Sequence, residues 1–123
     1  MSHVIAAVST ALAPSAIGIL RLSGDGAIAV AQKVFSRPLD RVPDRTLVLG
    51  TLYDRQGRAI DQVLCTVSRA PHSYTGEDTA ELQCHGSPAV LAAGLEALFA
   101  AGARQAQRGE FTKRAFLNGS EEH

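Results

Sequence analysis

The residues best placed to do chemistry lie in the stretch 73–86, where a polar turn, Ser-Tyr-Thr-Gly-Glu-Asp, leads into an alternating segment and then into a helix start. Side chains of an extended chain alternate between its two faces. The alternation therefore predicts that Ala80, Leu82 and Cys84 face a core and that Glu81 faces away from it. A carboxylate in this position can accept two neighbouring N–H donors at once.

Two further side chains could contribute to such a site. Arg21 follows Ile17 and Ile19 on one face of a predicted strand, 17–22. It either extends along the surface and pairs with a structural carboxylate, or offers bidentate donors to a ligand oxygen. Tyr74 could stack on an aromatic ligand or lie in the turn as amphipathic surface.

Other candidate motifs are weaker, and no catalytic residue and no metal ligand is predicted. His85 has no neighbours at metal-ligand spacing, so a hydrogen-bonded structural imidazole is the favoured interpretation. Cys65 and Cys84 are predicted to be buried free thiols, which is consistent with a reducing compartment. The Gly-Asp-Gly at 24–26 lacks the rest of a nucleotide-binding motif and is predicted to be a strand-to-helix turn.

Composition predicts one domain: 123 residues, 46% of them hydrophobic, are enough to bury a core. Twelve Lys and Arg balance twelve Asp and Glu, so no global field favours nucleic acid, and any RNA contact needs a local patch. Apolar runs stay well below the roughly 20 residues of a membrane span. We expect no membrane association and a cytoplasmic location.

The helices and strands that position these residues are predicted from the spacing of apolar residues and from the positions of glycine and proline. Strands are predicted at 4–8, 17–22, 45–54, 59–69, 79–84 and, as a short edge strand, within 103–107. Helices are predicted at 25–36 with Asp25 as N-cap and after Ser87-Pro88 up to Gly102, and the stretch 108–119 is predicted to be a turn followed by a short helix that ends at Asn-Gly. The segments 45–54 and 59–69 should form an antiparallel hairpin. The fold class is α+β, a mixed, largely antiparallel sheet with helices on one face.

Four motifs in this order, at 18–24, 73–78, 81–86 and 109–119, resemble the N-terminal domain of the tRNA-modification GTPase family MnmE (TrmE). The resemblance covers nearly the whole chain. It implies a folate-binding, aminomethyltransferase-like domain over residues 1–119 that forms homodimers and binds 5-formyl-tetrahydrofolate as one-carbon donor. The family modifies the wobble uridine, U34, of certain tRNAs, with the flavoprotein MnmG (GidA) as its partner.

The resemblance also suggests roles for individual residues. Glu81 would bind the pterin, Arg21 the tail carboxylates or the formyl oxygen, and Tyr74 would stack on a ring. The family places a lysine after Asn-Gly, where this chain has Ser120, the first residue of a divergent or appended tail, 120–123. Arg108, Lys113 and Arg114 could form a patch toward tRNA or a neighbouring domain, although three charges on a short helix are ordinarily a solvated face.

Some family functions have no counterpart in these residues. No Gly-x-x-x-x-Gly-Lys-Ser/Thr occurs, so binding of GTP, Mg²⁺ and K⁺ is expected only in the family's GTPase domain. Two alternatives stay open: a stand-alone folate-dependent one-carbon transferase, and a structural dimerisation module without ligand.

Overall fold

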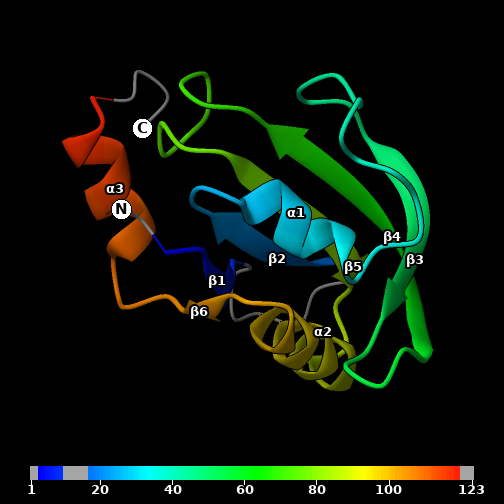
Figure 1. Ribbon diagram of the computed structural model, residues 1–123. Coiled ribbons are helices and arrows are strands. Elements are labelled where there is room, and N and C mark those ends of the chain that lie inside the picture. Colours follow the sequence, from blue (N-terminus) through cyan, green and yellow to red (C-terminus); the bar gives the residue numbers. More distant parts are fainter. Residues whose placement is uncertain (1–2, 10–16, 120–123) are drawn as a thin grey trace.

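A computed structural model describes residues 3–9 and 17–119 and has a mixed sheet with helices packed on it (Figure 1). The strands form one sheet in the order β3-β4-β5-β2-β1-β6. All neighbours are antiparallel except β1 and β6, which are parallel. The predicted α+β class is confirmed. The elements are β1 (Ile5–Val8), β2 (Ile17–Ser23), α1 (Ala27–Gln32), β3 (Val48–Tyr53), β4 (Ala59–Ser68), β5 (Thr79–His85), α2 (Pro88–Ala100), β6 (Arg104–Gln105) and α3 (Glu110–Leu117).

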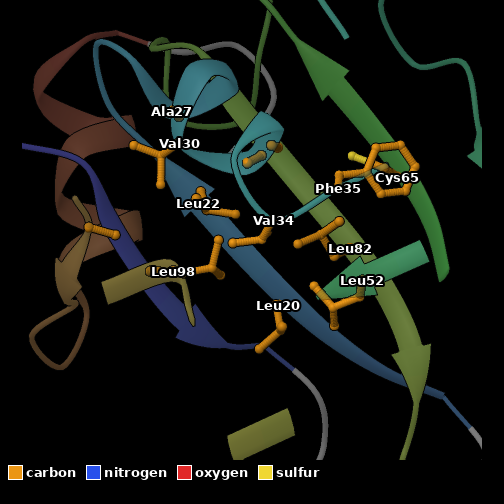
Figure 2. Packing of buried hydrophobic residues seen from close by; sticks show 14 of the residues in the cluster. Leu20, Leu22, Ala27, Val30, Val34, Phe35, Leu52, Cys65, Leu82 and Leu98 are labelled. Carbon is orange, nitrogen blue, oxygen red and sulfur yellow. The ribbon is translucent and has the colours of Figure 1, made fainter. Parts of the chain in front are cut away.

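One face of the sheet carries the core, and α1 and α2 cover it (Figure 2). The period-two alternation places Leu20 and Leu22 of β2, and Leu82 of β5, on this face, each with no exposed surface. Val30 of α1 and Leu98 of α2 pack against the same cluster. The opposite face of β2, β4 and β5 is only partly buried, and we call it the open face. Glu81 lies on it, as predicted.

A glycine allows an unusually close approach between α1's end and β3. A Cβ added to Gly50 would lie 2.5 Å from the ring of Phe35. Phe35 is 4% exposed and pairs as an isolated bridge with Leu52. Because Gly50 has no side chain, the ring of Phe35 can pack directly on β3 and cover this edge of the core.

The boundaries of α1 differ from the prediction. The helix begins after Gly26, which is left-handed with φ 91°, and Asp25 is not its N-cap. It ends at Gln32 because residues 34–36 hydrogen-bond to β3, where Tyr53 donates to the carbonyl of Val34. The apolar spacing predicted that these residues form the last turn of the helix, but they pair with β3 instead.

The other predicted boundaries agree with the structure to within a few residues. Ser87 is the N-cap of α2, although its side chain makes no capping bond. Gly102 ends that helix region with φ 125°. The Gly-Asp-Gly stretch is a strand-to-helix turn, as predicted.

Candidate functional site

The candidate site begins with a pair of charged side chains on the open face. Arg21 of β2 and Glu81 of β5 are direct partners in the antiparallel register. The Nε of Arg21 donates to Oε2 of Glu81 at 2.7 Å, and their side chains are 29% and 26% exposed. Strand pairing thus fixes both groups. The structural carboxylate that the sequence suggested for Arg21 is Glu81 itself.

Tyr74 completes this group from the turn before β5. The guanidinium carbon of Arg21 lies 5.5 Å from the centroid of the Tyr74 ring, a cation–π contact. Three of the four residues named from the sequence therefore meet in one place. The fourth, Ser120, lies outside the described residues.

A cavity of about 310 Å³ opens beside this group. Glu81 and Tyr74 line it together with Arg45, Leu47, Thr66, Ser68 and Thr79. The cavity combines one carboxylate, three hydroxyl side chains from β4 and β5, an aromatic ring and a guanidinium. The lining therefore places hydrogen-bonding groups beside one aromatic ring and one positive charge.

Thr66 supplies the most specific observation in the cavity. It is the register partner of Glu81 on β4. Its Oγ1 is buried, and no group of the described residues forms a hydrogen bond with it. A buried hydroxyl without a partner costs free energy, so a ligand that supplied one would be favoured.

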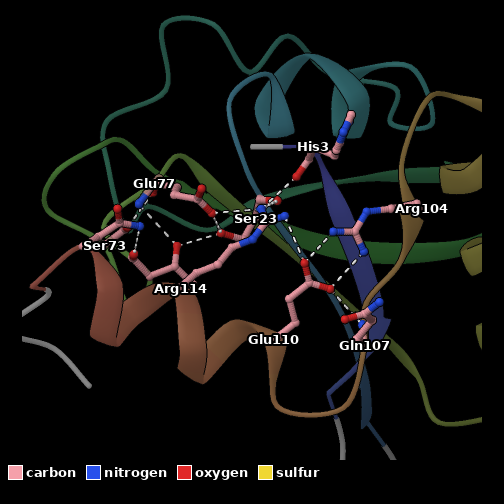
Figure 3. Close-up of polar contacts among 10 residues, drawn as sticks. His3, Ser23, Ser73, Glu77, Arg104, Gln107, Glu110 and Arg114 are labelled. Atoms are coloured by element: carbon pink, nitrogen blue, oxygen red, sulfur yellow. Dashed lines mark hydrogen bonds and ion pairs between the residues drawn. The ribbon is translucent and has the colours of Figure 1, made fainter. Parts of the chain in front are cut away.

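A buried polar network holds the turn that carries Tyr74 (Figure 3). The hydroxyl of Ser23 lies 2.6 Å from that of Thr75 and donates to Glu77 at 2.8 Å. Ser73 donates to the carbonyl of Glu77, and Asn118, the C-cap residue of α3, donates to the carbonyl of Thr75. The turn is thus tied to both β2 and α3.

The same network anchors α3. Arg114 donates to Glu77 at 3.1 Å and to Glu110 at 3.1 Å, and its side chain is only 11% exposed. The sequence pattern favours solvent-exposed charged side chains on this helix, and this prediction is wrong for Arg114. Ion pairing with two carboxylates, and hydrogen bonds to the carbonyls of His3 and Ser23, make its burial possible.

Glu110 is the most strongly perturbed carboxyl of the network. Both of its oxygens accept from Arg104, at 2.9 and 2.5 Å. These bonds, with the backbone N–H of Gln107 and the charge of Arg114, lower the pKa of Glu110 from 4.5 to about 2. The hydrogen bonds to Glu110 also raise the pKa of Arg104. Glu110 is therefore ionised throughout the neutral and mildly acidic range.

His85 and the cysteines play structural parts. Asp61 accepts from the backbone N–H of His85 at 2.8 Å, and its other oxygen lies 2.6 Å from Nδ1 of the ring. The hydrogen-bonded imidazole is confirmed, although the side chain is 73% exposed. Burial raises the pKa of each thiol, Cys65 and Cys84, to about 12.

Across the described ranges, no three His, Cys, Asp or Glu side chains gather in a way that could hold a metal ion. In that same part of the chain, no helix is long and apolar enough to cross a membrane.

Sequence reasoning missed five of the lining residues: Arg45, Leu47, Thr66, Ser68 and Thr79. Thr66 carried a usable signal, because the hairpin and the following strand place it on the same face as Glu81. Arg45 carried none: it takes a left-handed backbone conformation, φ 62°, which a sequence pattern does not predict for arginine.

Comparison with known proteins supplies the context. Residues 4–120 match the family described as GTP-binding protein TrmE N-terminus. The chain is 52% identical over 118 residues to the tRNA modification GTPase MnmE of Shouchella clausii, covering 94% of this chain and 26% of that protein. The proteins of the same name from Carboxydothermus hydrogenoformans and Thermus thermophilus are 48% and 50% identical, over 97% and 94% of this chain. The chain spans about a quarter of the length of these relatives (26–27%).

Proposed function

The chain belongs to the TrmE N-terminus family, and on that premise we propose that it binds 5-formyl-tetrahydrofolate and forms homodimers as part of an enzyme that modifies U34 of tRNA. The names of the relatives support the tRNA-modification role. GTP, Mg²⁺, K⁺ and the flavoprotein MnmG are assigned to the full-length protein. The folate is the one-carbon donor, and this chain's residues bind and orient it.

The observation that carries the folate proposal is the unpartnered hydroxyl of Thr66 beside the carboxylate of Glu81. A reduced pterin presents an amino group and a ring N–H side by side, and a carboxylate can accept both. Oε2 of Glu81 already accepts a hydrogen bond from Nε of Arg21, which holds the carboxyl group in place. Oε1 has no partner among the described residues, so it is free to accept from a ligand.

The other lining residues fit the rest of a folate. The Tyr74 ring offers a face to the pterin or the aminobenzoyl group. Arg21 and Arg45 bring positive charge to the region of the cavity, where the tail carboxylates or the formyl oxygen need it. Ser120, at the family's lysine position, lies outside the described residues and remains part of the proposal as a folate-binding position.

Homodimerisation rests on a second observation. Ile17, Leu47 and Leu49 expose 52%, 53% and 60% of their surface. The alternation along β2 and β3 places Ile17 and Leu49 on the open face, and Leu47 directly precedes β3. Exposed apolar patches of this kind mark interaction surfaces. Leu47 also lines the cavity, so a second copy seated on this face would border the folate site.

Calorimetry of the protein with 5-formyl-tetrahydrofolate tests the site. Glu81→Gln keeps the size of the side chain but replaces one acceptor oxygen with a donor, so we expect an affinity loss of about 5- to 150-fold, or roughly 1–3 kcal/mol. Arg21→Ala should weaken binding as well, and its thermal stability must be measured because the arginine also packs on Tyr74.

The matched control is Glu96→Gln, the same substitution on α2, where Glu96 forms an exposed ion pair with Arg55. It should bind folate like the wild type. Unchanged affinity in both the Glu81 and Arg21 variants would show that the ligand does not bind here. Wild-type protein that binds no folate at all would favour the structural dimerisation module.

A further inference from the structure

A second cavity, of about 530 Å³, lies between α3 and the sheet edge formed by the chain near His3 and β6. It is separate in its lining from the candidate folate cavity. Its charged lining consists of four cations, Arg104, Arg108, Lys113 and Arg114, and two carboxylates, Glu77 and Glu110. These formal charges leave the cavity with two positive charges, although the whole chain is balanced.

Two of the cations are committed to the protein itself. Arg104 makes two hydrogen bonds to Glu110. Arg114 is shared between Glu77 and Glu110 and is almost buried. These four side chains form a neutral, rigid wall (Figure 3).

The other two cations remain available. Arg108 precedes α3 and Lys113 lies in its second turn, and both side chains are exposed. Within the ranges 3–9 and 17–119, neither side chain has a hydrogen-bond or ion-pair partner. The surplus positive charge of the cavity therefore resides on two groups that are free to bind an anion.

We propose that this cavity binds the phosphodiester backbone of an RNA, with Arg108 and Lys113 as the phosphate contacts. Phosphate oxygens are strong acceptors for guanidinium and ammonium groups. The fixed ion pairs of the wall satisfy Glu77 and Glu110, so these carboxylates do not compete for the two free cations. The choice of RNA over another polyanion rests on the proposed tRNA-modification function.

The test measures binding of the protein to a fluorescently labelled RNA stem–loop by anisotropy, between about 50 and 200 mM salt. The double variant Arg108→Gln/Lys113→Gln removes both contacts from exposed positions. Each lost phosphate contact lowers the slope of log affinity against log salt by about 0.7 to 0.9. We expect a slope shallower by about 1.4 to 1.8, and weaker binding at every salt concentration.

The matched control is Arg37→Gln/Arg41→Gln, which makes the same charge change at exposed positions between α1 and β3. β3 lies at the opposite edge of the sheet from β6. The control should keep the wild-type slope. Equal slopes in the two double variants, or no RNA binding by the wild type at low salt, would overturn the proposal.

Two more measurements separate this proposal from others. Calorimetry with inorganic phosphate alone measures whether the cavity binds a free anion. If phosphate binds tightly and the double variant leaves RNA binding unchanged, the assignment to RNA is overturned. Calorimetry of the same variant with 5-formyl-tetrahydrofolate should give the wild-type affinity. Loss of RNA contacts with intact folate binding supports the RNA site independently of the folate site.

Discussion

At the scale of single residues, two residues that line the candidate folate cavity have locally unfavourable features, one in its side chain and one in its backbone. The hydroxyl of Thr66 is buried with no partner among the described residues, and Arg45 has a left-handed backbone, which costs a non-glycine residue about 1–2 kcal/mol. Such local costs concentrate at binding sites, where the surrounding structure maintains them. In the proposed folate complex the hydroxyl of Thr66 would gain a partner from the ligand, whereas Arg45 is held in the ligand-free fold by hydrogen bonds to the carbonyls of Val67 and His72.

Thr66→Val tests this explanation, because valine has nearly the same shape and no hydroxyl. In the ligand-free protein we expect the free energy of unfolding to rise by roughly 1 kcal/mol, since an unpaired buried hydroxyl is removed. Folate affinity should fall in the same variant. Urea denaturation and calorimetry measure the two effects, and a destabilised ligand-free variant would mean that the hydroxyl already has a stabilising partner.

The two thiols make a second prediction at this scale. With each pKa near 12, only about one ten-thousandth of either cysteine is thiolate at pH 8. Iodoacetamide should therefore leave native protein unmodified and alkylate both Cys65 and Cys84 after denaturation. Mass spectrometry of the two samples checks this; rapid alkylation of the native protein would contradict the burial of the cysteines.

At the scale of elements, α3 is attached by charge more than by apolar packing. Ala115 is its one buried residue, whereas Phe116 and Leu117 are 71% and 70% exposed. Arg114, Glu110 and Arg104 make the contacts to the rest of the domain. The position of α3, and with it the Tyr74 turn, should depend on ionisation of the network.

Acid should therefore loosen α3. Because the folded-state pKa of Glu110 lies at about 2, below its ordinary 4.5, the stability it contributes is present above pH 4.5 and is lost as pH falls toward 2. Glu110→Gln should be less stable than wild type at pH 6, and the difference should shrink through this window. Urea titrations from pH 6 to 2 measure it, and a pH-independent difference would exclude the ion pairs as its source.

Elements were far easier to predict from the sequence than their tertiary contacts. Alternation in 79–85 and apolar spacing in 88–100 were enough to assign β5 and α2, because both patterns reflect burial on one face. The pairing of Arg21 with Glu81 depends on strand register, which joins residues 60 positions apart in sequence. The burial of Arg114 depends on carboxylates from two segments, and no local pattern encodes that.

At the scale of the whole molecule, the sheet has one face filled by α1 and α2 and another that exposes leucine and isoleucine side chains. The open face also carries the proposed folate cavity, so the proposed dimer interface and the proposed ligand site would share a surface through Leu47. Folate that contacts both copies would bind the dimer more tightly than the monomer. Linkage then requires that folate also strengthens the dimer.

Sedimentation velocity at tens of micromolar protein tests this arrangement. Wild type should sediment as a dimer, and Leu49→Lys should shift it toward monomer because a charge is placed on the apolar face. Phe116→Lys, which changes an exposed apolar residue on α3, is the control and should stay dimeric. A monomeric wild type in the presence of saturating folate would rule out this interface.

The parallel pairing of β1 with β6 has a consequence for how the chain is made. Ile5 pairs with Arg104, so the first strand of the sheet obtains its second neighbour only after most of the chain has been synthesised. At typical translation rates of about 5–20 residues per second, that interval is roughly 5–20 s. Until then β1 is an edge strand with unpaired backbone groups on one side. The nascent chain therefore presents to chaperones and neighbouring chains a strand edge that the finished domain covers.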